Sequence, residues 1–309
     1  MESIRDSFGR KFNGLRVSVT QKCNLNCPHC HREGQRKAII EMSPSEIGEI
    51  VSVASSLGAS KVKITGGEPL LRDDICDIVS AIRPNIREIS MTTNGILLAE
   101  FADSLKSAGL DRVNISLHSL SGDNLNLISG KDYLEEVKTG LEAASKASLG
   151  PIKLNMVVLR GINDNEIWQM ARFSAAHGAI LQLIELASDR SGCNSEFFTK
   201  HHFSLGELES KLAAESSSIS YNELHRRARY ALDVDGAQVN VELVRSMHNT
   251  AFCANCTRLR LTSDGRLKGC LYENGNSPNM LGALRSGATE EQLRMLFCDA
   301  ISVRKPYWS

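Results

Sequence analysis

Three cysteines stand close together near the start of the chain, Cys23, Cys27 and Cys30, in the spacing C-x₃-C-x₂-C. They follow residues 15–20, a β-branched apolar run that predicts a strand. The thiols would therefore lie past the carboxyl end of a strand, where parallel α/β folds form their active sites. Thiolates at this spacing bind soft metal centres, and a [4Fe–4S] cluster held by three of them keeps one iron open to a non-protein ligand. A zinc knuckle or a half-formed disulfide site is the alternative.

A second trio, Cys253, Cys256 and Cys270, follows the spacing C-x₂-C-x₁₃-C near the other end of the chain. Asp264-Gly265 is a hairpin turn signal between two alternating runs, and such a hairpin brings Cys270 back to the other two thiols. Structural zinc is again the alternative, and it needs a fourth ligand from His248 or a distant cysteine. Two trios in one chain make two clusters with an open iron the economical interpretation.

Two arginines, Arg258 and Arg260, alternate beside the second trio and would face the same side of a strand. Guanidinium groups in this arrangement suit bidentate binding of phosphates or of a polar base edge. Their burial needs an anionic partner, which favours an anionic substrate. Cys76 and Cys298 lie in helical patterns and are predicted core residues, whereas the pattern around Cys193 assigns it no role.

Strand and helix patterns alternate along the first part of the chain. The predicted strands are 15–20, 61–65, 89–93, 113–117, 152–158 and 180–186, and the predicted helices are 44–57, 73–82, 98–108, 133–147 and 166–176. Six strand–helix units in order predict a parallel sheet covered by helices.

Two closures of that sheet compete, an open doubly wound sheet and a barrel. Polar residues recur at the ends of the predicted strands: Thr65, Thr92, Ser116, Asn155 and Glu185. A ring of polar strand ends around one mouth favours the barrel.

The pattern weakens beyond residue 189. Helices are predicted over 204–214 and 224–231, with a serine-rich stretch at 216–220 between them. The basic run 225–229 indicates a solvated face, with phosphate binding as the alternative.

Composition indicates an ordinary globular protein of 309 residues with 42% hydrophobic and 23% charged residues. Lys plus Arg equals Asp plus Glu at 36 each, so no global positive field draws the chain to nucleic acid or to an anionic membrane. The first residues lack the apolar region of a signal peptide, and no apolar run is long enough to span a bilayer, so a cytoplasmic protein is expected. Nine cysteines in such a protein indicate metal or redox chemistry rather than disulfides.

The first trio, placed after the first strand, resembles the signature of the radical S-adenosylmethionine (SAM) superfamily. The resemblance implies that SAM binds the open iron and is cleaved to a 5′-deoxyadenosyl radical. It also implies an α/β fold, a partial six-stranded (β/α) TIM-like barrel. Residues 1–190 would form this barrel, and residues 191–309 a C-terminal extension that carries the second [4Fe–4S] site.

Both trios together, with C-x₂-C-x-R-x-R-x₉-C at the second, resemble the archaeal-type members of the GTP 3′,8-cyclase family of molybdenum cofactor biosynthesis. The match covers nearly the whole chain, including Phe8-Gly9-Arg10, 64–71, 157–166 and the ending Arg304-Lys305-Pro306-Tyr307. The resemblance implies a radical SAM lyase that removes the ribose 3′ hydrogen of GTP. Its product would be (8S)-3′,8-cyclo-7,8-dihydro-GTP, in the first step of molybdopterin biosynthesis.

The resemblance also implies roles for individual residues. The first cluster would be held by Cys23, Cys27 and Cys30, and the second by Cys253, Cys256 and Cys270. SAM would contact Gly66, Gly67, Glu68, Ser116 and His29, the two glycines allowing the methionine amine to approach the backbone. GTP would contact Arg16, Lys63, Thr92, Lys153, Arg258, Leu259 and Arg260. The implied partners are GTP as substrate and an electron donor. Neither nucleic acid nor a membrane is expected as a partner, and a homodimer is compatible with the resemblance.

The chain departs from the family pattern at several positions. His29 stands where an aromatic residue is usual, His118 where Asp is usual, and Ala187 where bacterial members have Met. The ending 305–309 lacks the Gly-Gly tail of bacterial members. Two other functions remain as alternatives: a radical SAM peptide-modifying enzyme with an auxiliary cluster, and a non-enzymatic module with two structural zinc ions.

Overall fold

The computed structural model describes residues 4–35, 37, 40–222, 227–273, 275 and 277–308. Its strands are β1 Gly14–Ser18, β2 Lys61–Thr65, β3 Glu88–Thr93, β4 Arg112–Ser116, β5 Lys153–Val158, β6 Ile180–Glu185, β7 Ser218–Tyr221, β8 Ala228–Val234, β9 Ala237–Val244, β10 Arg258–Leu261 and β11 Leu267–Lys268. Its α-helices are α1 Pro44–Ser56, α2 Ile75–Ile82, α3 Leu98–Ala108, α4 Gly122–Ser129, α5 Leu134–Lys146, α6 Ile167–Ala176, α7 Glu196–His201, α8 Gly206–Glu215, α9 Thr250–Ala254, α10 Met280–Arg285 and α11 Glu290–Ser302.

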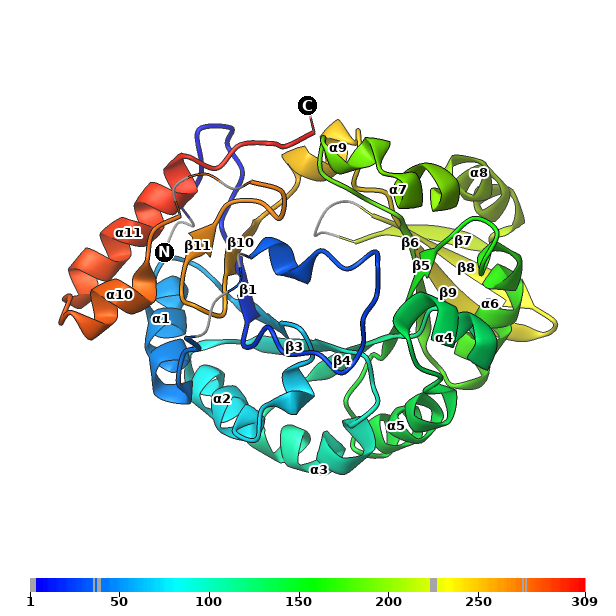
Figure 1. Ribbon diagram of the computed structural model, residues 1–309, viewed down its shortest axis with the longest axis horizontal. Coiled ribbons are helices and arrows are strands. Elements are labelled where there is room, and N and C mark those ends of the chain that lie inside the picture. Colours follow the sequence, from blue (N-terminus) through cyan, green and yellow to red (C-terminus); the bar gives the residue numbers. More distant parts are fainter. Residues whose placement is uncertain are drawn as a thin grey trace.

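All these strands belong to one sheet, in the order β11-β10-β1-β2-β3-β4-β5-β6-β9-β8-β7. Neighbours from β10 through β6 to β9 run parallel, whereas β11, β8 and β7 pair antiparallel. The sheet bends into an arc with α1 to α6 around its outside (Figure 1). Its two ends, β11 and β7, do not pair, so the barrel is open. The predicted partial (β/α) barrel is confirmed.

Two further parallel strands extend the six predicted ones. The predicted C-terminal hairpin is confirmed as β10 and β11, and it adds to the sheet beside β1, with Leu15 opposite Leu259 and Arg16 opposite Arg260. At the other end, β9 pairs with β6. The hairpin signal lies more than 200 residues after β1, and no local pattern could indicate that the two would pair.

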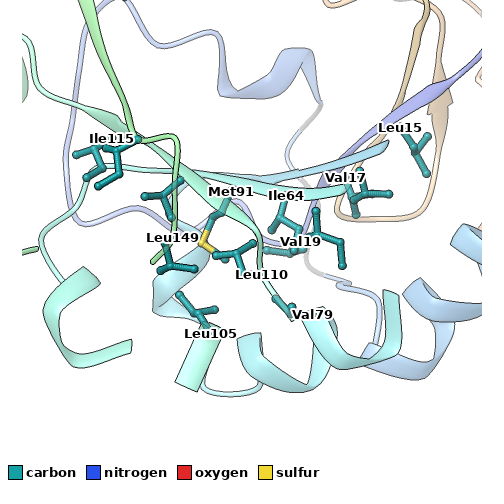
Figure 2. Packing of buried hydrophobic residues seen from close by; sticks show 14 of the residues in the cluster. Leu15, Val17, Val19, Ile64, Val79, Met91, Leu105, Leu110, Ile115 and Leu149 are labelled. Carbon is teal, nitrogen blue, oxygen red and sulfur yellow. The ribbon is translucent and has the colours of Figure 1, made fainter. Parts of the chain in front are cut away.

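The outer face of the sheet forms the hydrophobic core. Leu15, Val17, Ile64, Met91 and Ile115 are fully or almost fully buried and lie between the strands and the surrounding helices (Figure 2). Because side chains alternate along a strand, their neighbours in sequence face the inside of the arc. The inner face is therefore where the polar and charged strand residues gather.

Local signals position the helices. At the start of α1, Ser43 and Glu46 form the predicted capping box around Pro44. Gly109 ends α3 in the left-handed conformation, which glycine adopts at little cost. The helix α4 was not predicted, although Ser121 caps it.

The predicted helix over 224–231 is wrong in its described part, and residues 224–226 lie outside the described residues. From Ala228 the chain forms β8, which pairs with β9, and the serine-rich stretch contributes to β7. Alternation of buried and exposed residues along β8 is the period of a strand, and pairing with β9 decided between the two structures.

None of the helices in the described part of the chain is long and apolar enough to cross a membrane.

Candidate functional site

The first cysteine trio lies in the loop that follows β1. Its thiols lie near enough to influence one another electrostatically. The pKa of Cys27 is raised to about 12, chiefly by burial and then by the neighbouring thiols of Cys30 and Cys23. The loop is anchored at two points, by the Asn26 amide donating to the Ser129 carbonyl at 2.9 Å and by Asn94 donating to Asn24 at 2.7 Å. The fold thus gathers Cys23, Cys27 and Cys30 as the sequence predicted.

The glycine pair after β2 packs directly against the segment that leads into this loop. The Gly67 amide donates to the Thr20 carbonyl and the Glu68 amide to the Lys22 carbonyl, both at 2.8 Å. A Cβ at Gly66 would lie 2.6 Å from the Thr20 oxygen, and one at Gly67 would lie 2.1 Å from the Lys22 oxygen. The protein's own backbone therefore already requires glycine at both positions, a reason that the sequence did not reveal.

Glu68 is buried beside the same loop. Its carboxylate accepts hydrogen bonds from the Thr93 hydroxyl at 2.7 Å, the Asn94 amide at 2.7 Å and the Leu70 amide at 3.1 Å. Burial outweighs these bonds and raises the pKa of Glu68 to about 7. The side chain ties the ends of β2 and β3 together, and a cationic group bound nearby would stabilise its ionised form.

The second trio gathers at the hairpin side of the sheet. Cys253 is buried in α9, and its carbonyl accepts a hydrogen bond from Arg10 at 3.1 Å. Burial raises the pKa of Cys270, and so do the neighbouring thiols of Cys256 and Cys253. Burial acts to raise the pKa of Cys256, but Arg258, Arg304 and Arg260 together outweigh it and lower that pKa.

Each trio supplies three thiolates, the ligand set of a [4Fe–4S] cluster that keeps one iron open. Within the described residues, no three His, Cys, Asp or Glu side chains converge as ligands of one ion. Each thiolate of a [4Fe–4S] cluster binds a different iron, so its ligands stand further apart than around zinc. The ring of His248, the candidate fourth zinc ligand, packs on Trp308 at a centroid distance of 4.2 Å.

Four cations from neighbouring strands line the inner face between the two trios. Arg16 lies opposite Arg260 on one side and opposite Lys63 on the other. The pKa of Arg16 is lowered to about 10, chiefly by burial and further by the charges of Arg260 and Arg258. The carboxylate of Glu33 acts in the opposite direction. The pKa of Arg258 is lowered chiefly by burial.

Lys63 is the least compensated of these groups. Burial and the surrounding charges of Arg112, Arg16, Arg258 and Lys153 lower its pKa well below the ordinary value. Within the described residues no ion pair of its ammonium is present. An ammonium with cationic neighbours and no counter-charge marks a place for an anion.

A second group of cations surrounds Glu242 on β9. This fully buried carboxylate binds Lys153 at 2.6 Å and Arg229 at 2.7 Å, with Arg227 at 3.8 Å and Gln182 at 3.1 Å. Burial opposes ionisation of Glu242, but its cationic partners prevail and lower its pKa to about 2. Burial lowers the pKa of Lys153 to about 8 despite this partner.

Two arginines of the basic run 225–229 do not form the solvated face that the sequence predicted. Arg227 and Arg229 bind a buried carboxylate and do not form a solvated face, while His225 and Arg226 lie outside the described residues. The Arg227 Nε atom is buried and has no hydrogen-bond partner among the described residues. That atom remains available to a bound anion.

The remaining candidate residues lie in different surroundings. Thr92 is half-buried near the end of β3, and Ser116 is half-buried at the end of β4. Leu259 is fully buried with its side chain in the hydrophobic core, so only its backbone is available to a ligand. His29 packs edge-on against His118 at 4.9 Å, and burial lowers the pKa of His118 to about 4.

The C-terminal tail lies against the same region. Arg304 is buried and binds Asp6 at 2.8 Å and the Arg258 carbonyl at 3.1 Å. Beyond it, the Tyr307 hydroxyl accepts a hydrogen bond from the Arg190 amide at 3.1 Å, and its ring packs near Tyr272 at 5.2 Å. The tail therefore has a defined place next to the second trio.

A cavity of about 390 Å³ opens between the two cysteine regions. It is lined by His31, Gly34, Gln35, Ser188, Asp189, Leu271 and Tyr272. Its walls thus include residues that directly follow Cys30 and residues that directly follow Cys270. The residues that line it include neither the trio cysteines nor the cations of β1, β2 and β10.

Sequence reasoning missed Glu33, Arg112 and Glu242, whereas it named Arg227 within the basic run, with phosphate binding as the alternative to a solvated face. Glu33 lies just after the first trio, but nothing in the local pattern distinguishes its carboxylate from a solvated one. Arg112 faces the interior because it begins β4, where it pairs with Glu88 at 2.7 Å. Charged residues in strands of a parallel fold are the one signal that would have found Arg112 and Glu242.

Comparison with known protein families agrees with this architecture. The sequence model described as "Radical SAM superfamily" matches residues 17–174, slightly more than half of the chain. The one described as "Molybdenum Cofactor Synthesis C" matches residues 179–309.

Full-length relatives from archaea are similar to the chain. A protein of Pyrococcus abyssi named "Probable GTP 3′,8-cyclase" is 50% identical over 304 residues, which cover 98% of this chain and 99% of that protein. Proteins of the same name are 49% identical in Thermococcus kodakarensis and 46% identical in Methanothermobacter marburgensis, each match covering 99% of both chains.

Among solved structures, Streptococcus suis SuiB superimposes with a TM-score of 0.67 over 96% of this chain and 67% of that one, at 16% identity. The structure "Native anSMEcpe with bound AdoMet" gives a TM-score of 0.56 over 85% of this chain and 75% of that one, also at 16% identity. At such low identity these similarities show the fold alone. By its sequence, the chain belongs to the radical SAM superfamily and, within it, to the GTP 3′,8-cyclase family.

Proposed function

We propose that this protein is a GTP 3′,8-cyclase whose inner cationic face holds the nucleotide between the two cysteine trios. GTP is the substrate, and (8S)-3′,8-cyclo-7,8-dihydro-GTP is the product in the first step of molybdopterin biosynthesis. One observation supports the binding site above all others: buried cations stand on the adjacent strands β10, β1 and β2, and Lys63 among them has no ion pair within the described residues.

The cofactors fit the residues present. Cys23, Cys27 and Cys30 would hold the cluster that binds SAM, and Cys253, Cys256 and Cys270 would hold the cluster that faces the substrate. When bound, SAM and its cluster supply the 5′-deoxyadenosyl radical that removes the ribose 3′ hydrogen. Carbonyl groups of Gly66 and Gly67 would accept from the methionine ammonium, because an ammonium group only donates hydrogen bonds.

The protein's own contribution is to position the substrate. Lys63 and Lys153 would bind the triphosphate, whose charge offsets the cost of burying their ammonium groups. Arg16, Arg258 and Arg260 lie nearer the second trio and would orient the rest of the nucleotide. Binding energy from the phosphates, remote from the reacting carbon, then fixes the ribose for attack on C8 of the guanine.

Arg112 and Arg227 extend this proposed phosphate site. The charges of both act on Lys153 and lower its pKa further, which places the three groups in one electrostatic neighbourhood. The unpartnered Nε atom of Arg227 is a donor suited to a terminal phosphate. The sequence resemblance implied neither residue.

The proposed reaction also implies partners. Cleavage of SAM needs one electron for each event, so an external one-electron donor must reduce the cluster. A homodimer and a division of the chain at residue 190 remain predictions. Measurement of the molar mass in solution tests the first, and limited proteolysis tests the second.

Anaerobic turnover tests the function. The protein with reconstituted clusters, SAM, a reductant and GTP is expected to form the cyclic product, identified by mass spectrometry together with 5′-deoxyadenosine. Cleavage of SAM without a GTP-dependent product would refute the proposal. GTP labelled with deuterium at the ribose 3′ carbon is expected to transfer that label to 5′-deoxyadenosine.

A further inference from the structure

Glu33 binds three neighbouring strands at once. Its carboxylate accepts a hydrogen bond from Thr65 on β2 at 2.9 Å, lies 3.2 Å from the Arg16 Nε atom on β1, and pairs with Arg260 on β10. The three side chains of the ion pairs are only 14% to 19% exposed. Burial opposes ionisation of Glu33, but Arg16 and Arg260 outweigh it and lower its pKa.

The residues on either side of Glu33 bind the hairpin that carries the second trio. His31 packs edge-on against Tyr272 at 5.4 Å. The Gly34 carbonyl accepts a hydrogen bond from Lys268, and Gln35 accepts one from the Ser263 amide at 2.8 Å. Residues 31–35, which we call the strut, therefore connect Cys30 directly to the β10–β11 hairpin.

Packing and backbone conformation leave the strut little freedom. A Cβ at Gly34 would lie 2.1 Å from the Leu271 carbonyl oxygen. Arg32 and Glu33 adopt positive φ values of 46° and 54°, which L side chains rarely do. Residues held in such conformations persist only where the surroundings impose them, and they concentrate at functional sites.

A purely stabilising ion pair would not need this arrangement. Glu33 leaves the Arg16 Nε atom without a well-aligned hydrogen bond, and it is the carboxylate that separates two guanidinium groups on adjacent strands. Without its charge, Arg16 and Arg260 would repel each other and move apart. Its position fixes where both cations stand relative to the two trios.

We propose that Glu33 is a positioning residue, and that the strut sets the spacing between the two cluster sites. Glu33 acts through Arg16 and Arg260, which it holds side by side on the paired strands β1 and β10. This inference rests on the proposed function in one respect, the presence of a cluster at each trio. It assigns no contact between Glu33 and the nucleotide.

The test compares Glu33→Gln with the wild type after both clusters have been reconstituted. Pulsed EPR measures the magnetic interaction between the two reduced clusters, and thus their distance distribution, without SAM or GTP. The wild type is expected to give one narrow distribution, and Glu33→Gln one that is about twofold broader because the strut is no longer tied to β10 and β1. In turnover, product formed per 5′-deoxyadenosine is expected to fall by about tenfold, since misplaced groups uncouple the radical from the substrate.

Three further variants make the result specific. Glu33→Asp keeps the charge and is expected to restore part of the narrow distribution. Glu136→Gln removes a carboxylate from an exposed pair with Lys131 and is expected to behave as wild type. If Glu33→Gln fails to assemble both clusters, Thr65→Val, which removes only the neutral hydrogen bond to Glu33, is expected to broaden the distribution by a smaller amount.

A wild-type distance distribution in every variant that assembles both clusters would overturn the inference. So would equal broadening in Glu136→Gln. The distance measurement needs no GTP, so a wild type that forms no cyclic product refutes the proposed function alone. Normal turnover in the wild type with unchanged spacing in Glu33→Gln refutes the role of the strut alone.

Discussion

At the scale of single residues, burial is the largest influence on the pKa of Glu68, beside the first cysteine loop. Glu68 holds the loop after β2 through three hydrogen bonds, and yet its pKa is raised to about 7. Its partners are two amides and a hydroxyl, with no cation among them, which is why the cost of burial prevails.

The stability of the protein without SAM is therefore expected to depend on pH through Glu68. Between about pH 4.5 and about pH 7 the folded state holds a proton on this carboxyl that the unfolded state has released, so stability falls as the pH rises. Glu68→Gln removes this dependence of the free energy of unfolding on pH. The difference in free energy of unfolding between wild type and Glu68→Gln should change by on the order of 3 kcal/mol across that range. Urea unfolding at pH 5 and pH 8 measures it. Parallel stability curves for the two proteins would contradict the assignment.

Arg227 offers a test of which end of the nucleotide lies beside β8. Arg227→Gln removes a cation with an unpartnered Nε atom and is expected to weaken GTP binding by about tenfold. Binding of GMP should change far less, because it lacks the terminal phosphates. Anaerobic titration with each nucleotide provides the measurement, and Arg172→Gln, at an exposed pair with Asp235, serves as the control. An equal loss for both nucleotides would place the phosphates elsewhere.

At the scale of elements, the turn after β2 and the first cysteine loop depend on each other's backbone. Their contact leaves no space for a methyl group at Gly67. Formation of the first cluster site thus depends on a residue far from Cys23 in sequence.

Gly67→Ala is expected to disrupt the first site and leave the second intact. A Cβ 2.1 Å from the Lys22 oxygen must displace the segment that leads into Cys23. Because only the second cluster would then assemble, the iron content should fall by about half relative to wild type. Gly206→Ala is the matched control, since the nearest atom to its Cβ lies 3.5 Å away at the start of α8. Full iron content in Gly67→Ala would show that the loop adapts.

At the scale of the whole molecule, one buried arginine joins both ends of the chain to the sheet. Arg304 is 1% exposed and binds Asp6, the carbonyl of Arg258 on β10 and the carbonyl of Arg10. It holds the C-terminal tail and the N-terminal segment against the strand that carries two of the proposed GTP ligands.

Arg304→Met is expected to destabilise the protein by about 3 kcal/mol or more, because it leaves a buried carboxylate with one cation fewer and removes a donor from the carbonyls of Arg10, Lys11 and Arg258. Chemical denaturation measures the loss. Arg285→Ala, which breaks an exposed pair with Glu46, should cost far less, because water screens that pair. Similar losses in the two variants would mean that Arg304 does not join the termini in the way inferred.

The sequence by itself determined the features that are local. The spacing of the two cysteine trios, the capping of α1 and the alternation of six strands with helices depend on neighbouring residues, and the structure confirms the cap and the alternation. The hairpin of β10 and β11 was likewise predicted from its turn signal. The family followed from the trios because each is a short motif that stays recognisable without its tertiary context.

Only the tertiary structure decided which charges meet. Glu33 and Arg260 are 227 residues apart, and Lys153 and Glu242 are 89 apart, so no local pattern could indicate either pair. The placement of β10 beside β1 and of β9 beside β6 brings these groups onto one inner face, and it turned a predicted helix into β8. A charge in a strand acquires its role from the strands that pair with its own, and that pairing depends on the whole chain.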